Sequence, residues 1–202
     1  MKGKNVDRPS LSIPAQASLA PLAPELVVSE WLNTPAPLTL AALRGRPVFL
    51  HAFQLLCPGC VAHAVPQVQR IERVFAGSDL QIIGIHTVFE HHAAMSPVTL
   101  RAFLHEYRLK SPVAVDLAED GSDIPATMRR YRFRGTPSSV LIGRDGRIIH
   151  QAFGVEDDIA VGARIAMALS APRELQESSR SDDSGDCTDG RCPLPSAVIA
   201  AE

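Results

Sequence analysis

The sequence predicts an α/β domain whose sheet is largely parallel and carries an antiparallel hairpin at one edge. Apolar, strand-like runs alternate with amphipathic, helix-like segments from residue 48 to residue 133, an order typical of parallel strands joined by crossover helices. Asp145-Gly146 lies between two further apolar runs and predicts a tight hairpin. The 202 residues are 46% hydrophobic, which excludes wholesale disorder and suffices for one domain with extra segments.

Charge and hydropathy exclude two classes of partner. The formal net charge is only −2, and we interpret the short basic cluster at 129–134 as a solvated helix end, so nucleic-acid binding is not expected. No run reaches the roughly 18 apolar residues that a membrane span needs. Prolines interrupt the segment after the basic N-terminus, where a secretory signal would have its apolar region. We therefore expect a cytoplasmic protein.

The first half of the domain is predicted from apolar patterning and from its prolines. Residues 48–53 are almost all apolar, as in a strand buried on both faces. Pro58 suits the first position of a helix, and Pro66 should kink that helix. In order, the expected elements are an extended segment (24–33), a helical turn ending at Gly45 (38–46), a strand (48–53), a helix (58–77) and a second buried strand (80–86).

The second half continues the alternation and ends in the hairpin. Apolar residues recur at helical spacing in three segments, and short apolar runs separate them. In order, these are a helix (98–107), a strand (112–116), a helix (124–133), two hairpin strands (138–142 and 148–153) and a final helix (157–169).

Both ends of the chain differ in composition from the predicted domain at 25–172. Residues 1–24 are rich in Pro, Ala and Ser, and we interpret them as a flexible arm. Residues 173–202 are rich in Glu, Ser, Asp and Gly and form a predicted polar tail that contains Cys187 and Cys192.

The segment Cys57-Pro58-Gly59-Cys60 stands where a predicted strand ends and a helix begins. Free backbone N–H groups and the helix dipole favour an anion there, so they favour thiolate over thiol. Cys57 is therefore expected to be the nucleophile of the pair. Cys60, one turn further along, is expected to be less exposed. Pro58 and Gly59 shape the loop between the two sulfurs.

This arrangement predicts thiol–disulfide exchange. Cys57 would attack a substrate disulfide, and Cys60 would then displace the reduced substrate from the mixed disulfide. Close cysteine pairs in a reducing compartment are more often redox-active or metal-binding than structural. A static disulfide or a pair of inert core thiols is the alternative.

The motif and the order of elements together resemble the thioredoxin-like superfamily, and within it the TlpA-type and redoxin-type thiol–disulfide oxidoreductases. The resemblance covers roughly residues 25–170; it is carried by Trp31-Leu32-Asn33, Leu43-Arg44-Gly45-Arg46-Pro47-Val48, Cys57-Pro58-Gly59-Cys60, Gly135-Thr136-Pro137-Ser138 and Asp145-Gly146. It implies a thioredoxin fold, with a central mixed sheet and helices on both faces. It also implies a cis peptide bond at Thr136-Pro137 that exposes the backbone of Thr136 to an extended substrate beside Cys57.

The chain departs from this family at two places. Gln54-Leu55-Leu56 stands where an aromatic residue commonly precedes the first cysteine, so the surface around the thiol is more aliphatic. Pro66 lies six residues after Cys60, where about five is usual.

His51 occupies a strand position at which several thioredoxin-like proteins carry a buried acid. Our hypothesis is that the imidazole at this position acts as general base for Cys60, or stabilises thiolate if it is charged. A hydrogen-bonded core histidine is the alternative.

The tail pair Cys187 and Cys192 could exchange with the core pair, within one chain or between two. A structural loop disulfide or two spectator thiols are the alternatives.

Other functions have weaker support. A peroxiredoxin-like peroxidase needs a hydroxyl residue three positions before its cysteine, where Gln54 stands. A zinc module would use all four cysteines as ligands, but the two pairs lie far apart in sequence. His86, His91 and His92 match no strong metal motif, so we expect no metal and no cofactor. We expect a thiol- or disulfide-bearing substrate, an external thiol electron donor, and a monomer or weak homodimer.

Overall fold

A computed structural model describes residues 20–172, which contain one six-stranded mixed sheet. The strands are β1 (Val28–Leu32), β2 (Val48–Phe53), β3 (Gln81–His86), β4 (Val113–Asp116), β5 (Ser138–Ile142) and β6 (Ile148–Phe153), in the order β1-β4-β3-β2-β5-β6. The strands β2, β3 and β4 are mutually parallel, whereas β5, β6 and β1 run antiparallel to their neighbours. The predicted mixed sheet is therefore confirmed, and all six residues of its inner strand β2 are buried, as their apolar run predicts.

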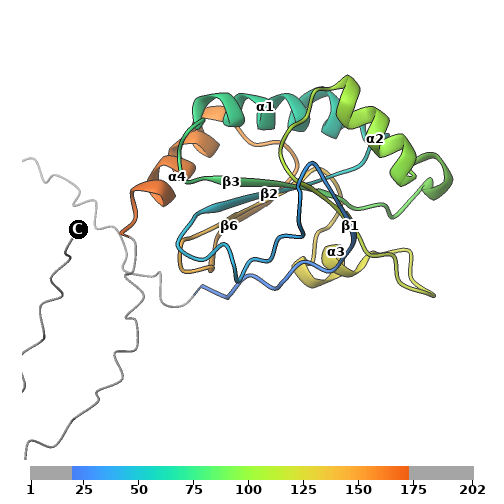
Figure 1. Cartoon of the computed structure of the whole chain (residues 1–202), viewed down its shortest axis with the longest axis horizontal. Coiled ribbons are helices and arrows are strands. Elements are labelled where there is room, and N and C mark those ends of the chain that lie inside the picture. The colour runs from blue at the N-terminus through green and yellow to red at the C-terminus, as the bar shows by residue number, and fades with distance from the viewer. Residues whose placement is uncertain (1–19, 173–202) are drawn as a thin grey trace, which may run out of the picture.

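Helices cover both faces of the sheet, as predicted (Figure 1). Helices α1 (Val65–Val74), α2 (Pro97–Glu106) and α4 (Asp158–Ser170) pack on one face. Helix α3 (Ala126–Tyr131) packs on the other face, together with the segment around Ala23 and the turn around Leu43. Alternate residues of β2 point into these two cores: Leu50 joins the α3 side, whereas Phe49 and Phe53 join the other.

The helix that begins at the cysteine motif differs from the prediction near Pro66. Instead of one kinked α-helix, residues Cys60–Ala64 form a π-helical turn, and α1 continues from Val65. The backbone N–H of Val65 donates to the carbonyl oxygen of Cys60, five residues earlier. A proline has no N–H to donate, and a wider turn immediately before it absorbs the missing bond.

Helix α3 is shorter than the predicted 124–133. Pro125, which is extended, stands immediately before it, and Arg132 ends it in the left-handed conformation with φ 53°. The carboxylate of the buried residue Asp116, at the end of β4, accepts hydrogen bonds from the N–H groups of Thr127 (2.7 Å) and Met128 (2.9 Å). A residue of the sheet therefore satisfies the first turn of this helix.

The described part of the chain includes residues 20–24, which the sequence assigns to the arm. The N–H of Ala23 donates to the carbonyl of Gly146, and Leu22 pairs with Arg147, so this stretch lies along the β5–β6 hairpin. The rest of the predicted arm, 1–19, and the predicted tail, 173–202, lie outside the described residues.

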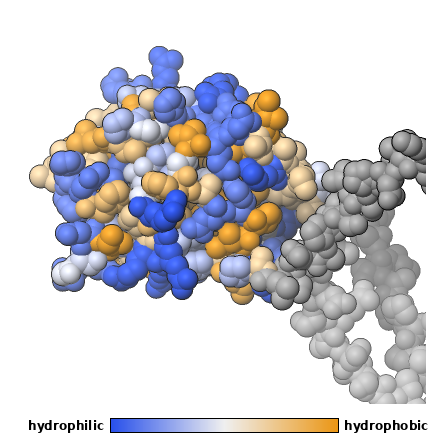
Figure 2. Space-filling view, turned by 180° about the vertical axis from the view of Figure 1, so that it is seen from behind, coloured by the Kyte–Doolittle hydropathy of each residue, from blue (hydrophilic) through white to orange (hydrophobic). Residues whose placement is uncertain are grey.

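The surface carries no single dominant apolar patch on the face that Figure 2 shows, where apolar residues form small separate groups among polar ones. Within residues 20–172, no helix is long and apolar enough to span a membrane.

Candidate functional site

The two cysteines of the motif meet at the end of β2, where the following helix begins. Their sulfur atoms lie 2.6 Å apart, and both are free thiols. A disulfide bond is about 2.05 Å long, so closing it requires little movement. The backbone N–H of Cys60 points at the sulfur of Cys57 (3.2 Å). The start of the helix therefore offers a donor to the first sulfur, as its position in the sequence predicts.

The two thiols differ in accessibility. Cys57 is half-buried, whereas Cys60 is fully buried against Leu55 and Val65. Burial raises the pKa of Cys60 to about 12, and the thiol of Cys57 adds to this rise. The backbone N–H of Gln54 and the hydroxyl of Thr136 act in the opposite direction. An incoming disulfide can reach only the first sulfur, and the second needs help to lose its proton.

The loop before β5 faces the cysteine pair across the site. The Thr136-Pro137 peptide bond is cis, as predicted. The thiol of Cys57 donates to the carbonyl oxygen of Thr136 (3.4 Å), so the predicted backbone site lies directly beside the sulfur. A Cβ atom on Gly59 would lie 3.4 Å from Cδ of Pro137, an ordinary contact, so the two loops pack at van der Waals distance.

Gln54 belongs to this site, although the sequence identified it only as an unusual residue before the motif. Its side chain is buried (1% exposed), and its Nε2 donates to Oγ1 of Thr136 (3.3 Å). Its Oε1 atom is buried and has no hydrogen-bond partner among the described residues. A polar residue at the end of an apolar strand is the one feature of the sequence that could have indicated this role. Only the folded chain shows that its partner is Thr136, 82 residues away.

His51 is buried in the core (5% exposed). Its ring stacks on Phe53 at 5.2 Å between centroids, and its Nδ1 has no hydrogen-bond partner among the described residues. Burial lowers its pKa to about 4, so the imidazole is neutral at neutral pH. This protonation state is compatible with the predicted general base and not with charge stabilisation of a thiolate. Phe53 packs in the same cluster as Cys60.

A second buried histidine, His86, stands at the end of β3, beside Phe53 at 5.6 Å between ring centroids. Both of its ring nitrogens are buried without partners among the described residues, and burial lowers its pKa to about 4. The sequence offered it only as a metal ligand. Between residues 20 and 172, no group of three or more His, Cys, Asp or Glu side chains could hold a metal ion.

The predicted second redox pair, Cys187 and Cys192, lies outside the described residues. The structure therefore neither places these cysteines near Cys57 nor separates them from it.

The chain is similar to known redox proteins over most of the described residues. The family model described as Redoxin matches residues 19–163. The curated protein DipZ of Mycobacterium tuberculosis is 31% identical over 146 residues, which are 71% of this chain and 20% of that protein. The chain therefore spans about a fifth of this relative. The thiol-disulfide oxidoreductase ResA of Bacillus anthracis is 27% identical over 132 residues, 65% of this chain and 68% of that protein.

Solved structures show the same fold. A thiol-disulfide isomerase from Corynebacterium glutamicum is 47% identical, with a TM-score of 0.72, and the match covers 77% of this chain and 99% of that one. A thioredoxin-like superfamily protein, SPOA0173, is 46% identical, with a TM-score of 0.73 over 75% and 98% of the two chains. The architecture described above is therefore a thioredoxin fold.

Proposed function

The chain belongs to the Redoxin family, and we propose that it is a thiol–disulfide oxidoreductase whose reacting groups are Cys57 and Cys60. The observation that carries this proposal is the geometry of the pair: an accessible sulfur at a helix start, a buried sulfur 2.6 Å away, and a cis-proline loop beside them. Relatives whose names state thiol-disulfide oxidoreductase or isomerase activity support it.

The proposed reaction runs in two exchange steps. The thiolate of Cys57 attacks one sulfur of a substrate disulfide, a mixed disulfide forms, and the other substrate sulfur leaves as a thiolate. Cys60 then loses its proton and attacks Cys57, which releases the second substrate sulfur and closes the Cys57–Cys60 disulfide. An external thiol donor returns the pair to the dithiol form. Substrate and protein exchange two electrons in each turnover.

The second step sets the main demand on the site. Cys60 has a pKa of about 12, so its thiolate must be stabilised when it forms. The N–H of Gln54 and the hydroxyl of Thr136 both favour that thiolate. His51 is neutral and stacks on Phe53, which packs in the same cluster as Cys60, and it remains the proposed proton acceptor. The carbonyl of Thr136 and the exposed side chain of Leu56 would hold the substrate on either side of Cys57.

Trapping the mixed disulfide tests the proposal. In a Cys60→Ser variant the second step is blocked, so incubation of the reduced variant with intact, disulfide-bonded insulin should leave a stable mixed disulfide on Cys57, seen by mass spectrometry. Cys57→Ser should yield no adduct and should lose essentially all disulfide reductase activity, because the buried sulfur cannot reach a substrate. Equal adduct formation on Cys57 and Cys60 in the wild-type chain would contradict the assigned roles. Thiol-dependent peroxide consumption faster than disulfide reduction would favour the peroxidase instead.

For the compartment we keep the cytoplasm as a proposal, which rests on the sequence patterning alone. Cell fractionation with antibodies against the chain would test it, and recovery with the membranes would contradict it.

A further inference from the structure

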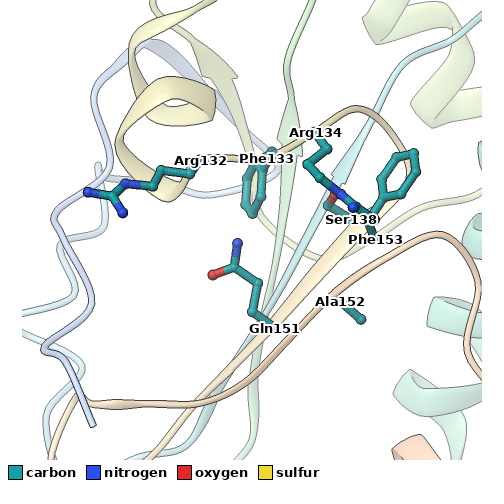
Figure 3. Close-up of a pocket in the computed structure, with 7 residues that line it drawn as sticks. All are labelled: Arg132, Phe133, Arg134, Ser138, Gln151, Ala152 and Phe153. Atoms are coloured by element: carbon teal, nitrogen blue, oxygen red, sulfur yellow. The ribbon is translucent and has the colours of Figure 1, made fainter.

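A pocket of about 330 Å³ lies beside the cis-proline loop. It opens between the connection from α3 to β5 and the edge strand β6, as Figure 3 shows. Its lining consists of Arg132, Phe133, Arg134, Ser138, Gln151, Ala152 and Phe153. The mechanism proposed above does not use this pocket.

Two residues that line the pocket flank the loop that contacts the reacting sulfur. Arg134 and Ser138 each lie two residues from Thr136, a span of at most about 7 Å. The carbonyl of Thr136 accepts from the thiol of Cys57 at 3.4 Å. A peptide bound in the pocket could therefore reach the sulfur of Cys57 with only a few further residues.

The lining of the pocket is positively charged. It contains two arginines and no carboxylate, and within residues 20–172 neither Arg132 nor Arg134 forms an ion pair. Arg129, in the same basic cluster, is instead paired with Glu119. The guanidinium of Arg134 lies over the ring of Phe153, 5.1 Å from its centroid, whereas the side chain of Arg132 extends on the opposite side of Phe133 (Figure 3). Guanidinium groups beside apolar walls suit a carboxylate-bearing polypeptide segment.

The chain itself contains a segment of complementary charge. Cys187 is surrounded by four aspartates within five positions, namely Asp182, Asp183, Asp186 and Asp189. We propose that this acidic segment docks against Arg132 and Arg134 and presents Cys187 to Cys57, so that the tail is a built-in exchange partner of the core pair. This inference rests on the proposed function of the core pair.

The chain is long enough for this contact. The last described residue is Pro172, and Asp186 follows fourteen residues later, a reach of up to about 46 Å. Arg144, at the far end of β5 from Ser138, donates to the carbonyl of Ala171. A five-residue strand is about 17 Å long, so the tail has to cover little more than the length of β5.

The exchange is balanced without any further reactant. The thiolate of Cys187 attacks the sulfur of Cys57 in the core disulfide, and the sulfur of Cys60 leaves as thiolate and takes up a proton. Cys192 loses its proton and attacks Cys187, which releases Cys57 as a thiolate. The core disulfide becomes a dithiol while the tail dithiol becomes a disulfide, and the reverse sequence passes two electrons back.

The test measures the effective concentration of the Cys187 thiol at Cys57. In a full-length Cys60→Ser/Cys192→Ser variant only Cys57 and Cys187 can bond, and equilibration with reduced and oxidised glutathione yields their effective concentration. Peptide mass spectrometry identifies the bond, and a dilute sample keeps it within one chain. We expect an effective concentration in the millimolar range or above. Adding Arg132→Gln and Arg134→Gln should lower it roughly fivefold at low ionic strength, and the difference should vanish near 0.5 M salt.

Two matched changes make the result specific. Arg73→Gln removes an exposed arginine on α1, away from the pocket, and should have no effect. Changing Asp182, Asp183 and Asp186 to Asn should reproduce the arginine effect, and combining both sets should add little further loss.

Two outcomes would overturn the proposal. One is an effective concentration that does not change when both pocket arginines are removed, and the other is a Cys57–Cys187 bond that forms only between two chains. Insulin reduction by the wild-type chain is measured in parallel. If it proceeds while either outcome is found, only the tail inference fails; if it is absent, the proposed function fails as well.

Discussion

At the scale of single residues, the chemistry of the site depends on a few buried polar groups. Gln54 connects the strand that carries the cysteines to Thr136, through Nε2 and Oγ1. Its amide occupies the hydroxyl oxygen as acceptor, which leaves the only hydrogen of that hydroxyl free to point elsewhere. The same hydroxyl lowers the pKa of Cys60. Gln54 is therefore a positioning residue, which acts on the second sulfur through Thr136.

Replacing Gln54 with Leu should separate stability from activity. The variant removes a buried amide whose Oε1 has no partner in the described residues, so the free energy of unfolding should change by less than about 1 kcal/mol. The resolving step should slow about tenfold, because the Thr136 hydroxyl is no longer oriented toward the thiolate of Cys60, and a hydrogen bond to a charged group weakened by about 1.4 kcal/mol corresponds to that factor. Stopped-flow release of substrate from the mixed disulfide measures this step.

A shift in the pH profile distinguishes positioning from mere packing. The rate of the resolving step increases with pH, and in Gln54→Leu the midpoint of this increase should lie at a higher pH than in the wild type. Thr136→Val should shift the midpoint in the same direction. If the profile is unchanged while the chain is strongly destabilised, the role of Gln54 is structural.

At the scale of elements, the sheet and the first turns of helices support each other. Asp116 at the end of β4 caps α3, and Asp157 caps α4 by accepting from the N–H groups of Ile159 and Ala160. The first cap is buried, and burial raises the pKa of Asp116. The second cap is exposed, so water can replace its side chain.

Removing the two caps should therefore have unequal costs. Asp116→Ala leaves two buried N–H groups without acceptors and should lower the free energy of unfolding by about 2 to 3 kcal/mol. Asp157→Ala should cost about 1 kcal/mol, because its N–H groups can bind water. Urea unfolding monitored by circular dichroism compares both variants with the wild type. Equal losses would show that burial of the cap does not matter.

Element boundaries also show where local sequence is a weak guide. The π-helical turn at Cys60–Ala64 and the early end of α3 at Arg132 were both missed, since each depends on how backbone donors find partners in the packed chain. The strands were predicted more closely, because a continuous apolar run such as 48–53 is buried on both faces only in the middle of a sheet.

At the scale of the whole molecule, stability should depend on pH through the two buried histidines. His51 and His86 both have pKa values of about 4, lowered from 6.5 by burial. Between these two values the unfolded chain binds more protons than the folded one, so stability is complete above about pH 6.5 and falls as the pH drops toward 4. Each histidine contributes a loss that approaches about 3 kcal/mol. The raised pKa of Asp116 acts in the opposite direction and offsets part of it.

Urea unfolding at pH 7.5, 6, 5 and 4 measures this dependence. His86→Leu should flatten the curve by about half and leave stability at pH 7.5 equal or higher, because both ring nitrogens are buried without described partners. An unchanged slope in His86→Leu would mean that this imidazole reaches water in the folded chain.

The sequence by itself determined the alternation of strands and helices, the position of Cys57 and Cys60 at a helix start, and, through the family resemblance, the cis bond at Thr136-Pro137. These features are local: periodicity, chain direction and the chemistry of a few adjacent residues specify them. Only the tertiary structure decided that Gln54 reaches Thr136, that two histidines are buried beside Phe53, and that two arginines without an ion-pair partner among residues 20–172 line a pocket beside the cis-proline loop. Those contacts join residues far apart in the chain. Their energies depend on how far each group is removed from water, and this depends on distant residues that pack around it.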